Sequence, residues 1–194
     1  MALELMFGIP SNQKFRVAKI IYDAFEDKYK HIYGSKEQTL YALIKFLRED
    51  RTIVAIHNSV VVGVGGLMFK HKKFIDSDFW SLVRILKLGI FRYLFNGWIF
   101  YLERVEEKEL LIDKLAVSRE MRGKGIGTLL IKSIIEFAAS NGYKLVKLEV
   151  TDTNKRAKKL YKKMGFKEVN VQKILFPWNK IFGFIKVSEM EYKI

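Results

Sequence analysis

A run of three glycines at alternate positions places the strongest constraint on how this chain can fold. The apolar stretch Leu115-Ala116-Val117 precedes it, and the run itself reads Arg122-Gly123-Lys124-Gly125-Ile126-Gly127-Thr128. The first turn of a helix has unbonded peptide N–H groups and a partial positive charge, which suit a phosphate. Glycine lets a diphosphate approach the backbone without meeting a Cβ, and Arg122 and Lys124 add positive charge. The run therefore predicts a phosphate-binding junction between a strand and a helix.

Two common phosphate-binding motifs do not fit this run. A Rossmann fingerprint needs a glycine three residues after its second glycine, and the residue three after Gly125 is Thr128. A P-loop needs Gly-Lys-Ser/Thr after a four-residue spacer, which is also missing. Taken alone, the glycines could also form a tight strand-to-helix turn with no ligand, which is the less favoured alternative.

The remaining patterns predict one α/β domain over residues 1–194. Helical periodicity covers residues 14–33 and 36–48, and two β-branched runs around Asn58-Ser59 predict a hairpin. Gly63, Gly65 and Gly66 in its second arm predict a bulge or a close backbone approach. Further strands are expected at Leu110–Val117, Leu145–Thr151, Phe166–Leu175 and Val187–Ile194, and helices at Thr128–Asn141 and Lys155–Met164. Strand, helix and strand in this order imply a parallel crossover.

The segment 70–108 is rich in aromatic residues and predicts a helical insertion. Phe79–Tyr101 could reach across a bilayer, but it contains Arg84, Lys87 and Arg92. A cation near the bilayer centre costs about 2.5–3.5 kcal/mol, so no transmembrane helix is expected. A helical projection groups one set of apolar residues on one side: Phe79, Leu82, Val83, Leu86, Ile90 and Leu94. A second set interrupts the polar side, so the helix needs more than one apolar contact surface: Trp80, Ile85, Leu88, Phe91 and Phe95.

Two linked stretches resemble the GNAT superfamily of acyl-CoA-dependent N-acyltransferases. The first is Arg122-x-x-Gly125-x-Gly127 after a strand that ends Leu-Ala-Val. The second is similar to the strand and helix that follow in that superfamily: Leu148-Glu149-Val150, Asn154, Ala157, Leu160-Tyr161 and Gly165-Phe166. The likeness is strong over residues 110–168, whereas the rest of the chain agrees only in the order of its elements.

The resemblance implies an α/β (α+β) fold with flanking helices. Its central mixed, mostly antiparallel sheet would have about seven strands, splayed between strands four and five, and residues 70–108 would form an extra insertion between strands three and four. Acetyl-CoA would be the cosubstrate. Its pantetheine arm would pair with the backbone of Leu115, Ala116 and Val117, and its pyrophosphate would contact the N–H groups from Arg122 to Thr128. Asn154 and Ala157 match positions beside the cofactor arm, although Asn154 could serve only as a helix cap.

The same resemblance implies an N-acetyltransferase that transfers the acetyl group to a primary amine by direct attack. Tyr161 would be the general acid that protonates the departing thiolate, since a phenol with an ordinary pKa near 10 is protonated at neutral pH. Its alternative role is that of a core tyrosine on an apolar helix face. Glu149 would be a base acting through water, or else a surface carboxylate, and Asp113 is the alternative base. The rival function is a catalytically silent acyl-CoA-binding module that acts as a sensor.

The expected acceptor is a small-molecule, peptide or protein amine. Tyr29, Tyr33 and Trp178 fall in parts that flank the acceptor site in this fold, and the insertion adds Trp80, Phe91, Phe95 and Trp98. The insertion could form a lid, a homodimer interface or a lipid-docking surface through Arg84, Lys87 and Arg92. Peripheral membrane contact is the least favoured of the three.

Charge and composition limit the other partners. The net charge of +14 favours anionic partners, but no nucleic-acid-reading element accompanies it, so no specific nucleic-acid binding is expected. The chain has no cysteine, and His31, His57 and His71 match no metal-ligand spacing, so no metal site is expected. The N-terminus lacks the pattern of a signal peptide, and the protein is expected to be cytoplasmic.

Overall fold

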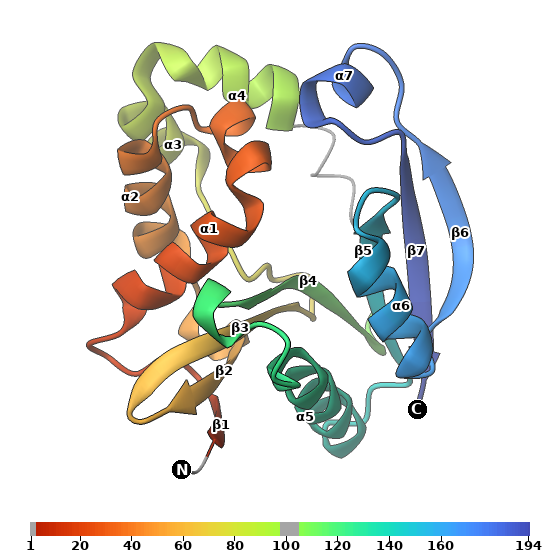
Figure 1. Cartoon of the computed structure of the whole chain (residues 1–194). Helices are drawn as coiled ribbons and strands as arrows, with labels where there is room; N and C mark the ends of the chain where they lie inside the picture. The colour runs from red at the N-terminus through yellow and green to blue at the C-terminus, as the bar shows by residue number, and fades with distance from the viewer. Residues whose placement is uncertain (1–2, 98–104) are drawn as a thin grey trace.

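The computed structural model describes residues 3–97 and 105–194 and contains a seven-stranded mixed sheet. The strands are β1 (Leu3–Phe7), β2 (Thr52–His57), β3 (Val60–Met68), β4 (Glu109–Val117), β5 (Leu145–Thr151), β6 (Lys167–Lys173) and β7 (Lys186–Lys193). They lie in the order β1-β2-β3-β4-β5-β7-β6, and β4–β5 is the parallel pair (Figure 1). The predicted sheet of about seven strands, mostly antiparallel, is confirmed.

Helices cover both faces of the sheet. They are α1 (Lys14–Ile32), α2 (Lys36–Phe46), α3 (Phe79–Leu86), α4 (Ile90–Gly97), α5 (Ile126–Ser140), α6 (Lys155–Lys163) and α7 (Trp178–Phe182), with 3-10 turns η1 (Glu49–Arg51), η2 (Lys87–Gly89) and η4 (Arg119–Met121). One apolar cluster contains residues of the four helices α1, α2, α3 and α4 together with residues of β2 and β3. Helix α5 packs in a second cluster with the alternate residues of β2 and β3. Because side chains alternate across a strand, α1 and α5 lie on opposite faces.

β2 and β3 are joined by a tight turn, and two glycines of β3 allow α5 to pack closely on the sheet. Asn58 and Ser59 both have positive φ, 49° and 61°, as the tight turn between β2 and β3 requires. A Cβ on Gly63 would lie 2.9 Å from Ile126 Cγ2, and one on Gly65 would lie 2.9 Å from Ile134 Cδ1. The predicted close approach is therefore an approach of α5, which begins directly after the glycine-rich run.

The two middle strands separate halfway along their length. β4 pairs with β5 only from Glu109–Leu145 to Ile112–Leu148. Beyond that point β4 remains bonded to β3 and β5 remains bonded to β7. The pairing of β3 with β4 shifts register so that Asp113 is an extra residue, a β-bulge that bends the strand where the two part. The predicted splay between the fourth and fifth strands is confirmed.

The insertion differs in detail from the predicted helix. Lys87 has φ 49° and ψ −124°, which ends α3, and η2 separates it from α4. Tyr93 is buried, whereas Leu94 in α4 and Phe79 in the first turn of α3 are exposed. The single projection over this segment was wrong for Phe79 and Leu94. Trp98 and Tyr101 lie outside the described residues.

The sequence patterns also missed two short elements. β1 was not predicted, and the loop expected around Trp178 contains α7. Both are five residues long, too short for a periodic signal. Over residues 3–97 and 105–194, no helix has the length and apolar character needed to cross a bilayer.

Candidate active site

Six consecutive peptide N–H groups lie unbonded at the start of α5. Within the described part of the chain, the backbone N–H groups from Gly123 to Thr128 donate to no acceptor, and the first bonded amide is that of Leu129, which donates to Gly125 O at 3.1 Å. The N–H of Arg122 is already used, since it donates to Arg119 O at 3.4 Å. The predicted series of free donors therefore begins at Gly123 and not at Arg122.

The three glycines serve different purposes in this turn. Gly123 and Gly125 have φ of 83° and 80°, a backbone region that strains any residue with a Cβ. Gly127 has an ordinary helical backbone, and a Cβ there would lie 3.7 Å from Leu160 Cδ2. Two glycines thus shape the loop, whereas a Cβ at the third would make only an ordinary contact with α6.

The positive charge around these N–H groups comes partly from a residue that the sequence patterns missed. Arg122 Nε donates to Val117 O at 3.1 Å, which ties this guanidinium to the end of β4. Lys124 is exposed, with Nζ 3.4 Å from Met121 Sδ. Arg156, in the first turn of α6, lies so close that a Cβ on Gly123 would be 3.6 Å from its Nη2. Its place two residues after Asn154 was the only sequence signal.

The predicted cofactor strand forms one edge of the gap in the sheet. Leu115 and Val117 pack in the cluster of α5, while Ala116 is buried in the cluster of α1. None of the three is paired with β5. The side of this backbone that faces β5 is therefore available to the amides of an extended ligand.

A hydrogen bond joins Asn154 and Ala157 at the start of α6. Asn154 caps α6, and its Oδ1 accepts from Ala157 N at 3.1 Å. The cap role considered for Asn154 is confirmed. Because the N–H of Ala157 is used in this bond, Ala157 can meet a ligand only through its half-buried methyl group.

Tyr161 lies on the α5 side of the sheet, beside the gap. It is 8% exposed and packs in the same cluster as Leu148 and Val150 of β5, with its ring centroid 6.1 Å from that of Phe166. Its hydroxyl makes no hydrogen bond to a described residue. Burial raises the pKa of Tyr161 to about 12, so the phenol keeps its proton at neutral pH.

The two carboxylates considered as bases lie toward the opposite face. Glu149 alternates with the buried residues Leu148 and Val150, so its exposed side chain points away from Tyr161. Asp113 occupies the bulge of β4 and is ion-paired with Lys114. The gap thus has a neutral acid on one face and two carboxylates on the other.

The α1 side of the gap contains a buried tyrosine. Lys114 Nζ lies 5.9 Å from the ring centroid of Phe25 on α1. Tyr29, one turn further along, is 3% exposed, and its hydroxyl oxygen has no hydrogen-bond partner among the described residues. Burial raises the pKa of Tyr29 well above its usual range, with Lys114 opposing and Asp113 adding to the shift.

Only part of the expected acceptor group comes together. Trp178 donates from Nε1 to Phe95 O at 3.1 Å, and their ring centroids are 5.6 Å apart. Tyr33 packs edge-on to Tyr29 at 5.8 Å. Trp80 and Phe91, which were expected to join them, are 72% and 70% exposed on the outside of the insertion.

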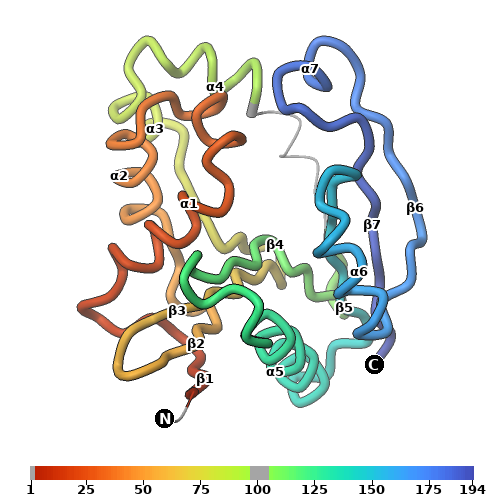
Figure 2. Tube along the Cα trace, in the orientation of Figure 1, coloured from red at the N-terminus to blue at the C-terminus, as the bar shows by residue number. Residues whose placement is uncertain are grey.

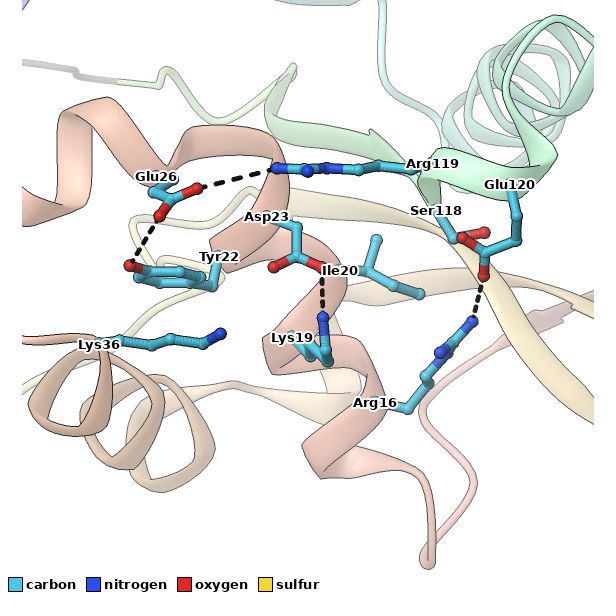
Figure 3. A pocket seen from close by; sticks show the side chains of 10 residues that line it. All are labelled: Arg16, Lys19, Ile20, Tyr22, Asp23, Glu26, Lys36, Ser118, Arg119 and Glu120. Atoms are coloured by element: carbon cyan, nitrogen blue, oxygen red, sulfur yellow. Dashed lines mark hydrogen bonds and ion pairs between the residues drawn. The ribbon is translucent and has the colours of Figure 1, made fainter.

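A separate polar pocket of about 380 Å³ lies between α1 and the residues that precede the glycine-rich run (Figure 3). Its charged groups are paired with one another: Arg16 with Glu120 at 2.6 Å, Lys19 with Asp23 at 2.6 Å and Arg119 with Glu26 at 3.8 Å. The backbone amide of Glu120 and the side chain of Arg16 lower the pKa of the Glu120 carboxyl. The Arg16–Glu120 and Arg119–Glu26 pairs hold the loop before the free N–H groups against α1. In the described part of the chain, no group of three or more His, Asp or Glu residues could hold a metal ion.

Comparison with known proteins agrees with this geometry. A family model described as Acetyltransferase (GNAT) family matches residues 18–166. An uncharacterized N-acetyltransferase of Methanocaldococcus jannaschii is 42% identical over 77 residues, which are 40% of this chain and 33% of that protein. The thialysine N-epsilon-acetyltransferase of Bos taurus is 29% identical over 85 residues, 44% of this chain and 46% of that protein. The aligned region thus spans a third to a half of these curated relatives.

Solved structures match over nearly the whole chain. An N-acetyltransferase from Staphylococcus aureus superposes with a TM-score of 0.66 at 20% identity, over 97% of this chain and 100% of that one. The ribosomal-protein-S18-alanine N-acetyltransferase from Escherichia coli superposes with a TM-score of 0.60 at 14% identity, over 100% of this chain and 94% of that one. At these identities the match concerns the fold.

Proposed function

Because this chain belongs to the Acetyltransferase (GNAT) family, we propose that it transfers an acetyl group from acetyl-CoA to a primary amine by direct attack. The observation that best supports this is the series of free N–H groups from Gly123 to Thr128 at one end of the gap between β4 and β5. A diphosphate would accept hydrogen bonds from these groups, and Arg156 would add positive charge. The pantetheine arm would then extend along Leu115–Val117 into the gap.

The proposed reaction uses both faces of the sheet. The amine nitrogen forms a bond to the thioester carbonyl carbon, and the bond from that carbon to sulfur breaks. The sulfur leaves as a thiolate and takes the proton of Tyr161, whose burial keeps the phenol neutral until then. The proton lost by the amine passes through water to Glu149 on the other face. Asp113, whose carboxylate is ion-paired with Lys114, is the alternative base.

A primary amine is the acceptor class most consistent with the relatives. One similar protein is named for the alanine of a ribosomal protein and another for thialysine. Tyr29, Tyr33 and Trp178 on the α1 and α7 side would form the walls of the acceptor site. The acceptor itself is a small molecule, a peptide or a protein that presents such an amine.

Replacing Tyr161 by phenylalanine tests this proposal. Tyr161→Phe keeps the packing on Phe166 but removes the proton donor, so we expect kcat to fall by about a hundredfold or more. The affinity for acetyl-CoA should stay nearly constant. Thiol release with a panel of primary amines measures the rate, and calorimetry measures the affinity.

Tyr192→Phe is the matched control, because Tyr192 packs on the same Phe166 ring with centroids 5.5 Å apart. It should leave kcat within about twofold of the wild-type value. An unchanged rate in Tyr161→Phe would remove Tyr161 from the mechanism. Acetyl-CoA binding without thiol release for any amine would instead favour the sensor module.

A further inference from the structure

The exposed residues of α3, η2 and α4 form an outer surface of the insertion that no other described element covers. Trp80, Leu88 and Phe91 are 72%, 84% and 70% exposed, and Arg84 and Lys87 are exposed among them. The inner residues of the same helices, Leu82, Leu86, Ile90 and Tyr93, are buried against α1 and α2. The insertion therefore has the two apolar sides that its sequence predicted, and the fold covers one of them.

This outer surface lies at the end of the molecule opposite the two termini. α4 and α7 lie side by side there, as the contact of Phe95 with Trp178 requires (Figure 2). The loop before α7 adds Leu175 and Phe176, which are 70% and 77% exposed. Several exposed large apolar side chains thus belong to elements at this end of the molecule.

Basic side chains predominate on the segments at this end, although the exposed Asp76 and Asp78 directly precede α3 and Asp78 caps it. Residues 79–97 and 169–188 contain six lysines and arginines and no aspartate or glutamate. Arg92 is committed to the fold, since its Nη2 donates to Tyr33 O at 2.9 Å. Arg84 and Lys87 are the exposed cations next to the outer aromatic residues, so these two, without Arg92, remain in the lipid-docking hypothesis.

We propose that this outer surface binds the surface of an anionic lipid membrane, with Trp80, Leu88 and Phe91 inserted at the interface and Arg84 and Lys87 on the lipid headgroups. Aromatic and aliphatic side chains flanked by basic ones bind in this way without crossing the bilayer. A second copy of the chain is a poorer occupant. A twofold interface would bring the cations of both copies together, and the adjacent Asp78 already accepts a hydrogen bond from Ser81 N as the cap of α3.

Vesicle co-sedimentation of the full chain tests the proposal without using its enzymatic activity. We expect binding to vesicles of phosphatidylcholine with phosphatidylglycerol, and little binding to phosphatidylcholine alone. Arg84→Gln with Lys87→Gln should weaken binding by about thirtyfold, from the contribution of each basic residue near an anionic surface. Leu88→Ser with Phe91→Ser should weaken it by at least about tenfold.

Phe15→Ser is the control, because Phe15 is 58% exposed in the first turn of α1, away from the insertion. It should bind as the wild type does. The substituted side chains are exposed, so circular dichroism should show native folding in every variant. The proposal is overturned if the wild type does not sediment with anionic vesicles, or if the two double variants bind as well as it does. It is also overturned if light scattering shows a dimer that Phe91→Ser dissociates while vesicle binding is absent.

Discussion

At the scale of the residue, Glu149 shows what a strand pattern can and cannot predict. Alternation along Leu145–Thr151 predicted that Glu149 lies opposite Leu148 and Val150, and the structure confirms this. Alternation could not predict that Asp113 is paired with Lys114, because this pairing depends on a bulge that forms where β4 pairs with β3. The extra residue brings Asp113 and Lys114 together near Tyr29, a contact between segments distant in sequence.

The two carboxylates can be told apart by matched amide substitutions. Glu149→Gln should lower kcat/KM by about a hundredfold and remove the acidic limb of its pH profile, because the base is lost. Asp113→Asn should lower kcat/KM by less than about tenfold, and should lower the free energy of unfolding because Lys114 loses its partner. Thiol-release rates across a range of pH measure the first effect, and urea unfolding measures the second. A large loss of rate in Asp113→Asn alone would exchange the two roles.

Arg156 shows why some site residues escape sequence reasoning. It lies in a basic run, Lys155 to Lys159, in which no pattern separates one cation from the next. Only the packing of α6 beside the glycine-rich turn places the Arg156 guanidinium next to Gly123. Motifs therefore pointed to Tyr161 and the glycines, whereas the supporting charge required the tertiary structure.

At the scale of the element, we expect a glycine at the junction of β4 and α5 to affect both stability and cosubstrate binding. Gly125 and Gly142 lie just outside opposite ends of α5 with φ of 80° and 77°, and a Cβ added to either would meet no atom within 4 Å. Either substitution by alanine should cost about 1–2 kcal/mol of unfolding free energy through backbone strain. Only Gly125→Ala should also weaken acetyl-CoA binding, by roughly tenfold or more, because it moves the free N–H groups.

Calorimetric titration of both variants, with urea unfolding alongside, measures these effects. Gly142→Ala controls for the loss of stability, since the strain is equal but the site is distant. Equal affinities in the two variants would mean that the turn at Gly125 does not position the cosubstrate.

Sequence reasoning missed or misplaced the short elements and the broken helix of the insertion for physical reasons. Long periodic segments, such as α1 and α5, were predicted within two residues at each end. β1 and α7 have five residues each and depend on tertiary contacts. The insertion is two short helices with a break at Lys87, and a helical projection could not show that Phe79, in the first turn of α3, and Leu94, in α4, are exposed.

At the scale of the whole molecule, two apolar clusters hold the two faces of one sheet that opens in the middle. The resemblance to the GNAT superfamily, which rests on the glycine motif and on the strand and helix after it, was enough to predict the opening between β4 and β5. The residues that would form the acceptor site could not be predicted as fully, because they come from α1, α4 and α7, which meet only after folding. The inner side of the insertion packs on α1 and α2, which leaves its outer surface exposed.

Amide NMR during titration with coenzyme A tests the central claim most directly. The claim is that the free N–H groups after β4 hold the diphosphate while the gap between β4 and β5 receives the arm. It predicts large shifts of the amide resonances of Gly123, Gly125 and Gly127, accompanied by smaller shifts along Leu115–Val117. Saturable binding that leaves these resonances in place and moves others instead, such as those lining the pocket beside α1, would contradict it.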